Sequence, residues 1–245
     1  MRSRTAGVAC VIALLALTGS SLHSAPPRAW PPFLRASDQY PAQMAAAITR
    51  LWSDATFTRS VTGDPAPVPL AFYLRFVDAP DVTAAAARHL RLTTYEVKAV
   101  GDDRYEVDNG NSTQGVYQVL ARDERTRVLL SWGTHRSAIL GTLGGSALTR
   151  LEFGDDAGRA TQRLAANVIV DNRFAAGMTR PFLALFGWLV DRKLNEAFRT
   201  AAAAAAWAHA RPEEFCAWLG GAIGDERRVE LRDVFDECAP ARRAG

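Results

Sequence analysis

The chain has 245 residues, of which 29 are Lys or Arg and 26 are Asp or Glu, so its formal charge is +3. This length suits one domain, or one domain with an appendage. The basic excess is small and no Lys/Arg run is interleaved with aromatic residues, so nothing in it favours a nucleic-acid partner.

The first 25 residues have the layout of a secretory signal peptide. Arg2 and Arg4 precede an apolar stretch at 6–17, and small and polar residues follow at 18–25. The apolar stretch is shorter than the roughly 20 residues that span a bilayer. We therefore expect residues 1–25 to be removed and the protein to be exported to the periplasm or the extracellular space. An uncleaved N-terminal anchor is the alternative.

Two cysteines remain after export, Cys216 and Cys238. An oxidising compartment favours a disulfide between such a pair, and the spacing matches neither a zinc site nor a redox motif. We predict a disulfide bridge that staples residues 211–245, a tail of one or two small helices. Two unpaired thiols on neighbouring helices are the alternative.

The segment 26–54 is predicted to be a proline-rich lead-in followed by an N-terminal helix. Ser37 is the expected start of this helix, because Met44, Ile48 and Leu51 recur at spacings of three and four.

A short mixed region is expected next. Residues 55–61 alternate like a strand, and the more apolar LAFYLRF at 70–76 is interpreted as a second strand after a proline-rich turn. An alanine-rich helix is expected at 78–90, with Pro80 in its first turn.

Alternating residues then predict an antiparallel meander. In the last strand, for example, Leu164, Ala166 and Val168 share one face. The strands are expected at residues 95–100, 104–108, 116–121, 127–134, 148–153 and 159–171. Ser146 follows Gly144-Gly145 but lacks the final glycine of a nucleophile elbow, so the passage is interpreted as a glycine-rich loop.

The region 181–210 is predicted to be one long helix, with almost no polar residue in its first turns. A surface helix would have a polar face there, so the first half is expected inside the sheet. The inward residues of that half are expected to be Phe182, Phe186, Leu189 and Val190. The second half, with six alanines at 201–206, is expected to project toward the rim.

This order of elements resembles the START-like, or SRPBCC helix-grip, superfamily. The resemblance covers about residues 68–200, including LAFYLRFVDAPDVTAAAARHL and LTRLEFGDDAGRATQRLAANVIVDN. It implies an α+β fold in which a curved antiparallel sheet grips a long C-terminal helix, here over residues 55–210. The superfamily includes lipid-transfer domains, polyketide cyclases and quinone-binding proteins. Its members usually have two short helices after the first strand, whereas only one is expected here.

A sheet that wraps a helix without being filled leaves an apolar pocket. We therefore expect an exported binding or carrier protein for a hydrophobic small molecule such as a lipid, isoprenoid or polyketide-like compound. Seven aromatic residues are candidates for the cavity wall or for ordinary core: Tyr95, Tyr105, Tyr117, Trp132, Phe182, Phe186 and Trp188. The ligand-binding candidates are Tyr117, Trp132, His135, Arg136, Arg180, Phe182, Phe186 and Val190.

Two other interpretations stay open. One is an enzyme on the same scaffold, a cyclase or hydrolase, which would need a titratable residue inside the cavity. The other is a cell-envelope interaction factor without a ligand, which would have a fully packed sheet. No catalytic residue, metal site or cofactor is predicted, and transient contact with a membrane is left open.

Overall fold

The structure, a computed structural model, describes residues 30–137, 141–170, 180–231 and 234–238, and for 180–194 it describes the backbone alone. The predicted signal peptide lies outside the described residues. The centre of the molecule is a seven-stranded sheet of order β1-β7-β6-β5-β4-β3-β2, and every neighbouring pair is antiparallel. The strands are β1 (Phe57–Ala66), β2 (Glu96–Gly101), β3 (Arg104–Asp108), β4 (Thr113–Arg122), β5 (Thr126–Ser137), β6 (Gly141–Asp156) and β7 (Arg159–Val170).

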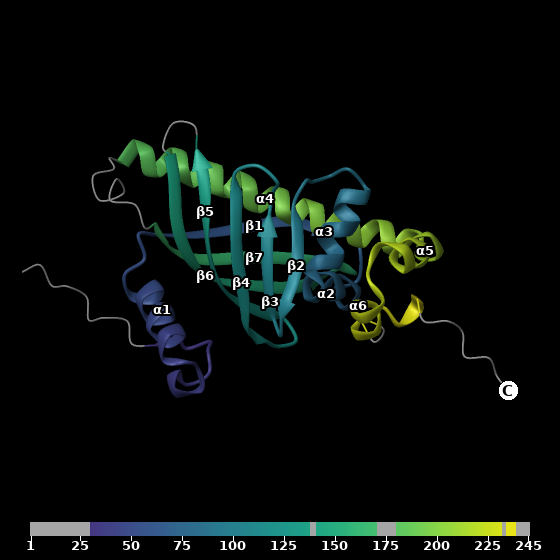
Figure 1. Ribbon diagram of the computed structural model, residues 1–245, viewed down its shortest axis with the longest axis horizontal. Coiled ribbons are helices and arrows are strands. Elements are labelled where there is room, and N and C mark those ends of the chain that lie inside the picture. The colour runs from purple at the N-terminus through teal and green to yellow at the C-terminus, as the bar shows by residue number, and fades with distance from the viewer. Residues whose placement is uncertain (1–29, 138–140, 171–179, 232–233, 239–245) are drawn as a thin grey trace, which may run out of the picture.

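One long helix, α4 (Arg180–Ala210), crosses this sheet. Strands β2 to β5 stand nearly upright in Figure 1 whereas β1 and β7 run nearly horizontally, so the sheet turns strongly across its width. Phe198 of α4 is buried on Val61 of β1 and Leu164 of β7. Gly63 permits this contact, since a Cβ there would lie 2.6 Å from the Phe198 ring. The predicted fold class, a curved antiparallel sheet gripping a long C-terminal helix, is confirmed.

The segment predicted as a second strand is a helix, α2 (Leu70–Asp78), and α3 (Pro80–His89) follows it directly. Tyr73 and Phe76, three residues apart, are 1% and 0% exposed, which is the spacing of one helix face. A short, almost wholly apolar run fits a strand and a buried helix equally well, and this is why the prediction was wrong. The chain therefore has the two short helices that the resemblance implies.

The glycine-rich passage before Leu148 is part of β6 and not a loop. Gly145 pairs with Gly133 of β5 on one side and with Val170 of β7 on the other. Ser146 accordingly lies in the middle of a strand, paired with Trp132, where no sharp turn presents its hydroxyl. The ladder hydrogen bonds of two neighbouring strands outweigh the turn preference of glycine at this position.

The second half of α4 does not project toward the rim. Ala204, Ala205 and Ala208 are at most 1% exposed, in a core cluster with Tyr73 and Phe76 of α2. Alanine side chains are small enough to let α2 approach the α4 backbone closely. This half of the helix is therefore buried by neighbouring helices, and the prediction that it projects toward the rim is wrong.

The N-terminal segment packs on part of the outer face of the sheet (Figure 1). Its helix α1 (Ala42–Ser53) buries Ile48 and Leu51 against Val128 of β5 and Leu148 of β6. The helix begins after Pro41 and not at Ser37, which opens the short 3₁₀ turn η1 (Ser37–Gln39). A residue that precedes proline is held extended, and this separates the two turns.

The C-terminal tail consists of α5 (Pro212–Ala222), α6 (Asp225–Glu230) and the 3₁₀ turn η3 (Asp236–Cys238). Across the described segments, no helix combines the length and the apolarity that a membrane crossing requires.

Candidate functional site

A cavity of about 410 Å³ lies between the concave face of the sheet, the α2–α3 pair and α4. This volume is within the range of small-molecule sites in proteins. Alternate residues of each strand point to this face, so the sheet contributes a largely apolar surface. The aliphatic residues of the sheet that line the cavity are Val97, Val107, Val119, Leu129, Leu151 and Leu164.

A buried hydrogen bond joins the helical wall to the sheet. The hydroxyl of Tyr73 donates to Oε1 of Gln162 at 2.5 Å, and Nε2 of Gln162 donates to the backbone oxygen of Asp64 at 3.1 Å. Burial raises the pKa of the Tyr73 hydroxyl far above its ordinary value, and the bond to Gln162 acts weakly in the opposite direction. Both polar side chains at this point of the wall therefore have their partners within the protein.

Paired charges form one end of the cavity. Arg127, 6% exposed, donates from Nε and Nη2 to the two carboxylate oxygens of Asp78, each at 2.7 Å. Arg122 donates to Asp78 at 3.2 Å and also to Asp103. Burial alone would lower the pKa of Arg122, but the hydrogen bond to Asp103 and the charges of both carboxylates raise it. We call Asp78, Asp103, Arg122 and Arg127 the charge network; it ties the end of α2 to β4 and β5.

Two stacked tyrosines lie beside the charge network. Tyr105 of β3 and Tyr117 of β4 are paired across the strands, with ring centroids 5.1 Å apart and planes at 21°. Burial raises the pKa of both hydroxyls, and each is further affected by neighbouring groups: Arg122 lowers the pKa of Tyr105, and Tyr105 raises that of Tyr117. Both rings line the cavity.

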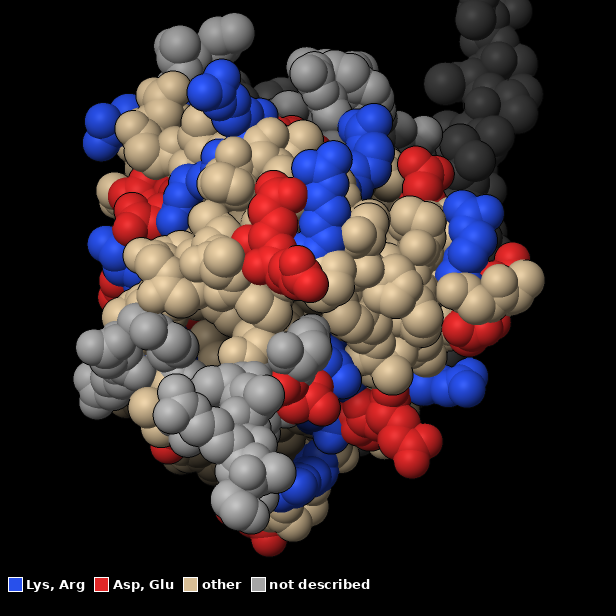
Figure 2. Space-filling view, turned by 90° about the vertical axis from the view of Figure 1, so that its right-hand side faces the viewer, with Lys and Arg blue, Asp and Glu red and all other residues tan. Residues whose placement is uncertain are grey.

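Beside the connection between α3 and β2, the cavity adjoins a polar hollow. Thr93, Tyr95 and Glu196 line both the cavity and this hollow, to which Arg88 and Arg91 also contribute. On the face of the molecule seen from the α5 and α6 side, acidic and basic side chains are interspersed and form no single-sign field (Figure 2).

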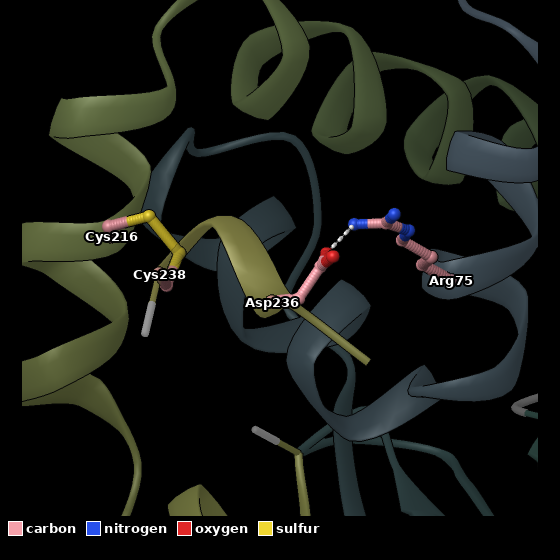
Figure 3. Close-up of a disulfide and its surroundings, with 4 residues drawn as sticks. All are labelled: Arg75, Cys216, Asp236 and Cys238. Carbon is pink, nitrogen blue, oxygen red and sulfur yellow. Dashed lines mark hydrogen bonds and ion pairs between the residues drawn. A yellow bond between two sulfur atoms is a disulfide. The ribbon is translucent and has the colours of Figure 1, made fainter. Parts of the chain in front are cut away.

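The disulfide-bonded tail supports the cavity wall from outside (Figure 3). Cys216 of α5 and Cys238 of η3 are joined in a disulfide, with their Cα atoms 5.0 Å apart, so the predicted pairing is present. Between them, the ring of Phe235 lies 5.3 Å from that of Phe76, and Asp236 accepts a hydrogen bond from Arg75 at 2.8 Å. Phe76 itself lines the cavity, so the tail packs directly behind the wall.

The predicted ligand-binding residues are not all in one place. Tyr117 lines the cavity, while His135 lies farther along the same face of the sheet, its Nδ1 2.9 Å from Oγ1 of Thr113. Trp132 pairs with Val116, on the opposite face of β4 from Tyr117, and the Arg104 guanidinium lies 5.5 Å over its ring. Arg136 alternates to that same outer face and is exposed.

The other four predicted residues lie where side chains are outside the described part of the structure: Arg180, Phe182, Phe186 and Val190. The same holds for the inward orientation expected of Leu189. The ligand-binding role of the whole set stays a prediction.

Sequence reasoning did not find the charge network or Gln162. These residues come from α2, the β2–β3 connection and three strands, and only the folded chain brings them together. The sequence did indicate part of the cavity wall. Tyr95, Tyr105 and Tyr117 were among the aromatic residues considered for a cavity, and all three line it. Among the described residues, no group of three His, Cys, Asp or Glu side chains is placed to hold a metal ion.

The sequence matches no protein-family model, and no curated protein matches it. Among solved structures, the chain is similar to a conserved protein from Geobacillus kaustophilus, with a TM-score of 0.43 and 11% identity, over 62% of this chain and 93% of that one. It is also similar to Ara h 8.0201, with a TM-score of 0.39 and 14% identity, over 61% and 96% of the two chains. A third similar structure is the di-domain ARO/CYC BexL from the BE-7585A biosynthetic pathway, with a TM-score of 0.39 and 16% identity, over 67% and 55%.

The chain has the helix-grip fold. Its own strand order and the helix that crosses the concave face identify this fold.

Proposed function

We propose that this protein is exported and reversibly binds a hydrophobic small molecule in the cavity between the sheet, α2, α3 and α4. The observation that carries the proposal is the cavity itself: about 410 Å³, lined mainly by aliphatic and aromatic side chains. Binding would remove apolar ligand surface from water, which contributes about 25 cal/mol per Å² before the costs of immobilisation.

An interaction factor without a ligand is a weaker explanation of this interior. Such a protein gains nothing from unfilled space, because interiors are otherwise packed to the density of organic crystals. Helix α1 packs on the outer face of the sheet, whereas space on the concave face is left unfilled. That asymmetry favours a bound ligand.

The export part of the proposal has two supports. Residues 1–25 have the layout of a signal peptide, and the Cys216–Cys238 disulfide suits an oxidising compartment.

Native mass spectrometry tests both parts in one measurement. The protein is purified without detergent from the organism that makes it, and its spectrum is recorded before and after denaturation. We expect a chain lacking about the first 25 residues, together with additional mass that is released on denaturation. A spectrum of the bare chain, combined with failure to take up the neutral dye N-phenylnaphthylamine, would remove the binding proposal. Retention of Met1 would remove the export proposal alone.

A further inference from the structure

Most polar side chains that line the cavity already have a partner inside the protein. Tyr73 and Gln162 are bonded to each other, Thr83 donates to the backbone oxygen of Phe76, and Thr200 donates to that of Glu196. The same is true of Thr93, whose Oγ1 accepts from the backbone nitrogen of Tyr95.

The side chains of the charge network neutralise one another. The two guanidinium groups of Arg122 and Arg127 face the two carboxylates of Asp78 and Asp103, and Arg127 also donates to the backbone oxygens of Asp123 and Thr126. A buried carboxylate or ammonium group on a ligand needs an opposite charge of its own. To obtain one here, it would have to break the ion pairs of Asp78.

Three tyrosine hydroxyls are the exception. Within the described part of the chain, the hydroxyls of Tyr95, Tyr105 and Tyr117 have no hydrogen-bond partner. Tyr95 is partly exposed and also lines the adjoining polar hollow, but Tyr105 is only 5% exposed and stacks on Tyr117 inside the cavity. Because burial raises the pKa of both inner hydroxyls, they keep their protons at neutral pH and act as donors.

We propose that the ligand is an uncharged, oxygen-bearing apolar compound, whose carbonyl, ether or hydroxyl oxygen accepts hydrogen bonds from Tyr105 and Tyr117. The inference rests on the proposed binding function and narrows it to one ligand class. Its apolar body would lie against the aliphatic residues of the sheet. Its oxygen would lie beside the charge network without entering it. Tyr105 and Tyr117 are thus assigned as the residues that determine specificity.

Displacement of N-phenylnaphthylamine by three matched probes tests this assignment on the unaltered protein. The probes are decane, methyl octyl ketone and decanoate, which share a chain length and differ in having no oxygen, a neutral oxygen or a charged group. We expect the ketone to bind more tightly than decane and decanoate by about tenfold, because it gains hydrogen bonds without an unpaired buried charge.

Variants then test whether Tyr105 and Tyr117 cause the preference for the ketone. Tyr105→Phe combined with Tyr117→Phe should weaken ketone binding about tenfold and leave decane binding within about twofold, since only the hydroxyls are removed. Tyr40→Phe is the matched control, because its hydroxyl is buried under the N-terminal segment on the other side of the sheet. Near-ultraviolet circular dichroism of each variant reports whether the cavity region stays folded.

The outcomes separate this inference from the function it rests on. If the dye does not bind, the binding function fails and the inference fails with it. If the dye binds but all three probes displace it equally, the function stands and the ligand class is wrong. Preference for decanoate, or an equal loss of decane and ketone binding in the double variant, would also overturn the assignment.

Discussion

At the scale of single residues, the cavity wall depends on polar groups that are buried together with their partners. Tyr73 is 1% exposed and Gln162 is 2% exposed, and their hydrogen bond joins α2 to β7. When a buried acceptor loses its donor, the folded protein still bears the free-energy cost of removing that acceptor from water. This bond therefore contributes more to stability than an average surface hydrogen bond does.

Replacing Tyr73 with Phe tests this contribution. Oε1 of Gln162 would then be buried without its donor, and we expect the free energy of unfolding to fall by about 2 kcal/mol. Urea denaturation followed by circular dichroism measures the change. Tyr40→Phe is the control, because the Tyr40 hydroxyl is buried with no partner in the described structure and its removal should cost little. Equal decreases in the free energy of unfolding of the two variants would show that the Tyr73–Gln162 hydrogen bond contributes no more to stability than the unpaired Tyr40 hydroxyl does.

At the scale of elements, the alternation of strand residues predicted the meander because one face of each strand is buried. The same reasoning failed at Leu70–Asp78, where the run is almost wholly apolar and only tertiary packing selects the helix. It failed again at Ala204 and Ala205, because an alanine-rich helix has no apolar pattern that shows which neighbours bury it. Of the cavity lining, Tyr95, Tyr105 and Tyr117 were among the aromatic candidates. The Asp78–Arg127 ion pair was not predictable, since nothing local links the two residues.

The stapled tail is the element whose stability depends most on a covalent bond. Replacing Cys216 and Cys238 with serine removes a cross-link between residues 22 positions apart, which should cost about 3 kcal/mol. We expect faster hydrogen exchange in α5 and at 234–238, with a smaller increase in α2 through the Phe235–Phe76 contact. Exchange in β4 to β6 should not change.

Hydrogen exchange read by mass spectrometry makes this comparison, with the reduced unaltered chain as a second route to the same state. A uniform increase across the sheet and the tail would contradict a local staple.

At the scale of the whole molecule, the buried tyrosines link stability to alkaline pH. Burial raises the pKa of Tyr73, Tyr105 and Tyr117 in the folded protein above the ordinary value of 10.0. Their contribution to stability is therefore fully present below pH 10 and is lost as the pH rises above that value, because the unfolded chain then releases protons that the folded chain retains.

We expect the absorbance of tyrosinate from these three residues to appear together with unfolding and not before it. A pH titration that records ultraviolet absorbance and far-ultraviolet circular dichroism in parallel checks this. In Tyr73→Phe the late absorbance step should shrink by about a third, since one of the three tyrosines with a raised pKa is gone. If all tyrosines ionise near pH 10 while the circular dichroism stays native, these hydroxyls are not held protonated by burial.

The pairing of β1 with β7 has a consequence for the order of folding. Phe57 lies opposite Val168, so the first strand and the last are neighbours although the rest of the sheet separates them in the chain. The β2–β5 meander joins strands through short connections, whereas the β1–β7 ladder closes the longest loop in the sheet, with a correspondingly larger loss of chain entropy. Until β7 is available, β1 has no partner strand and α4 has no complete surface to cross. We therefore expect the cavity to form last, once nearly the whole polypeptide is present.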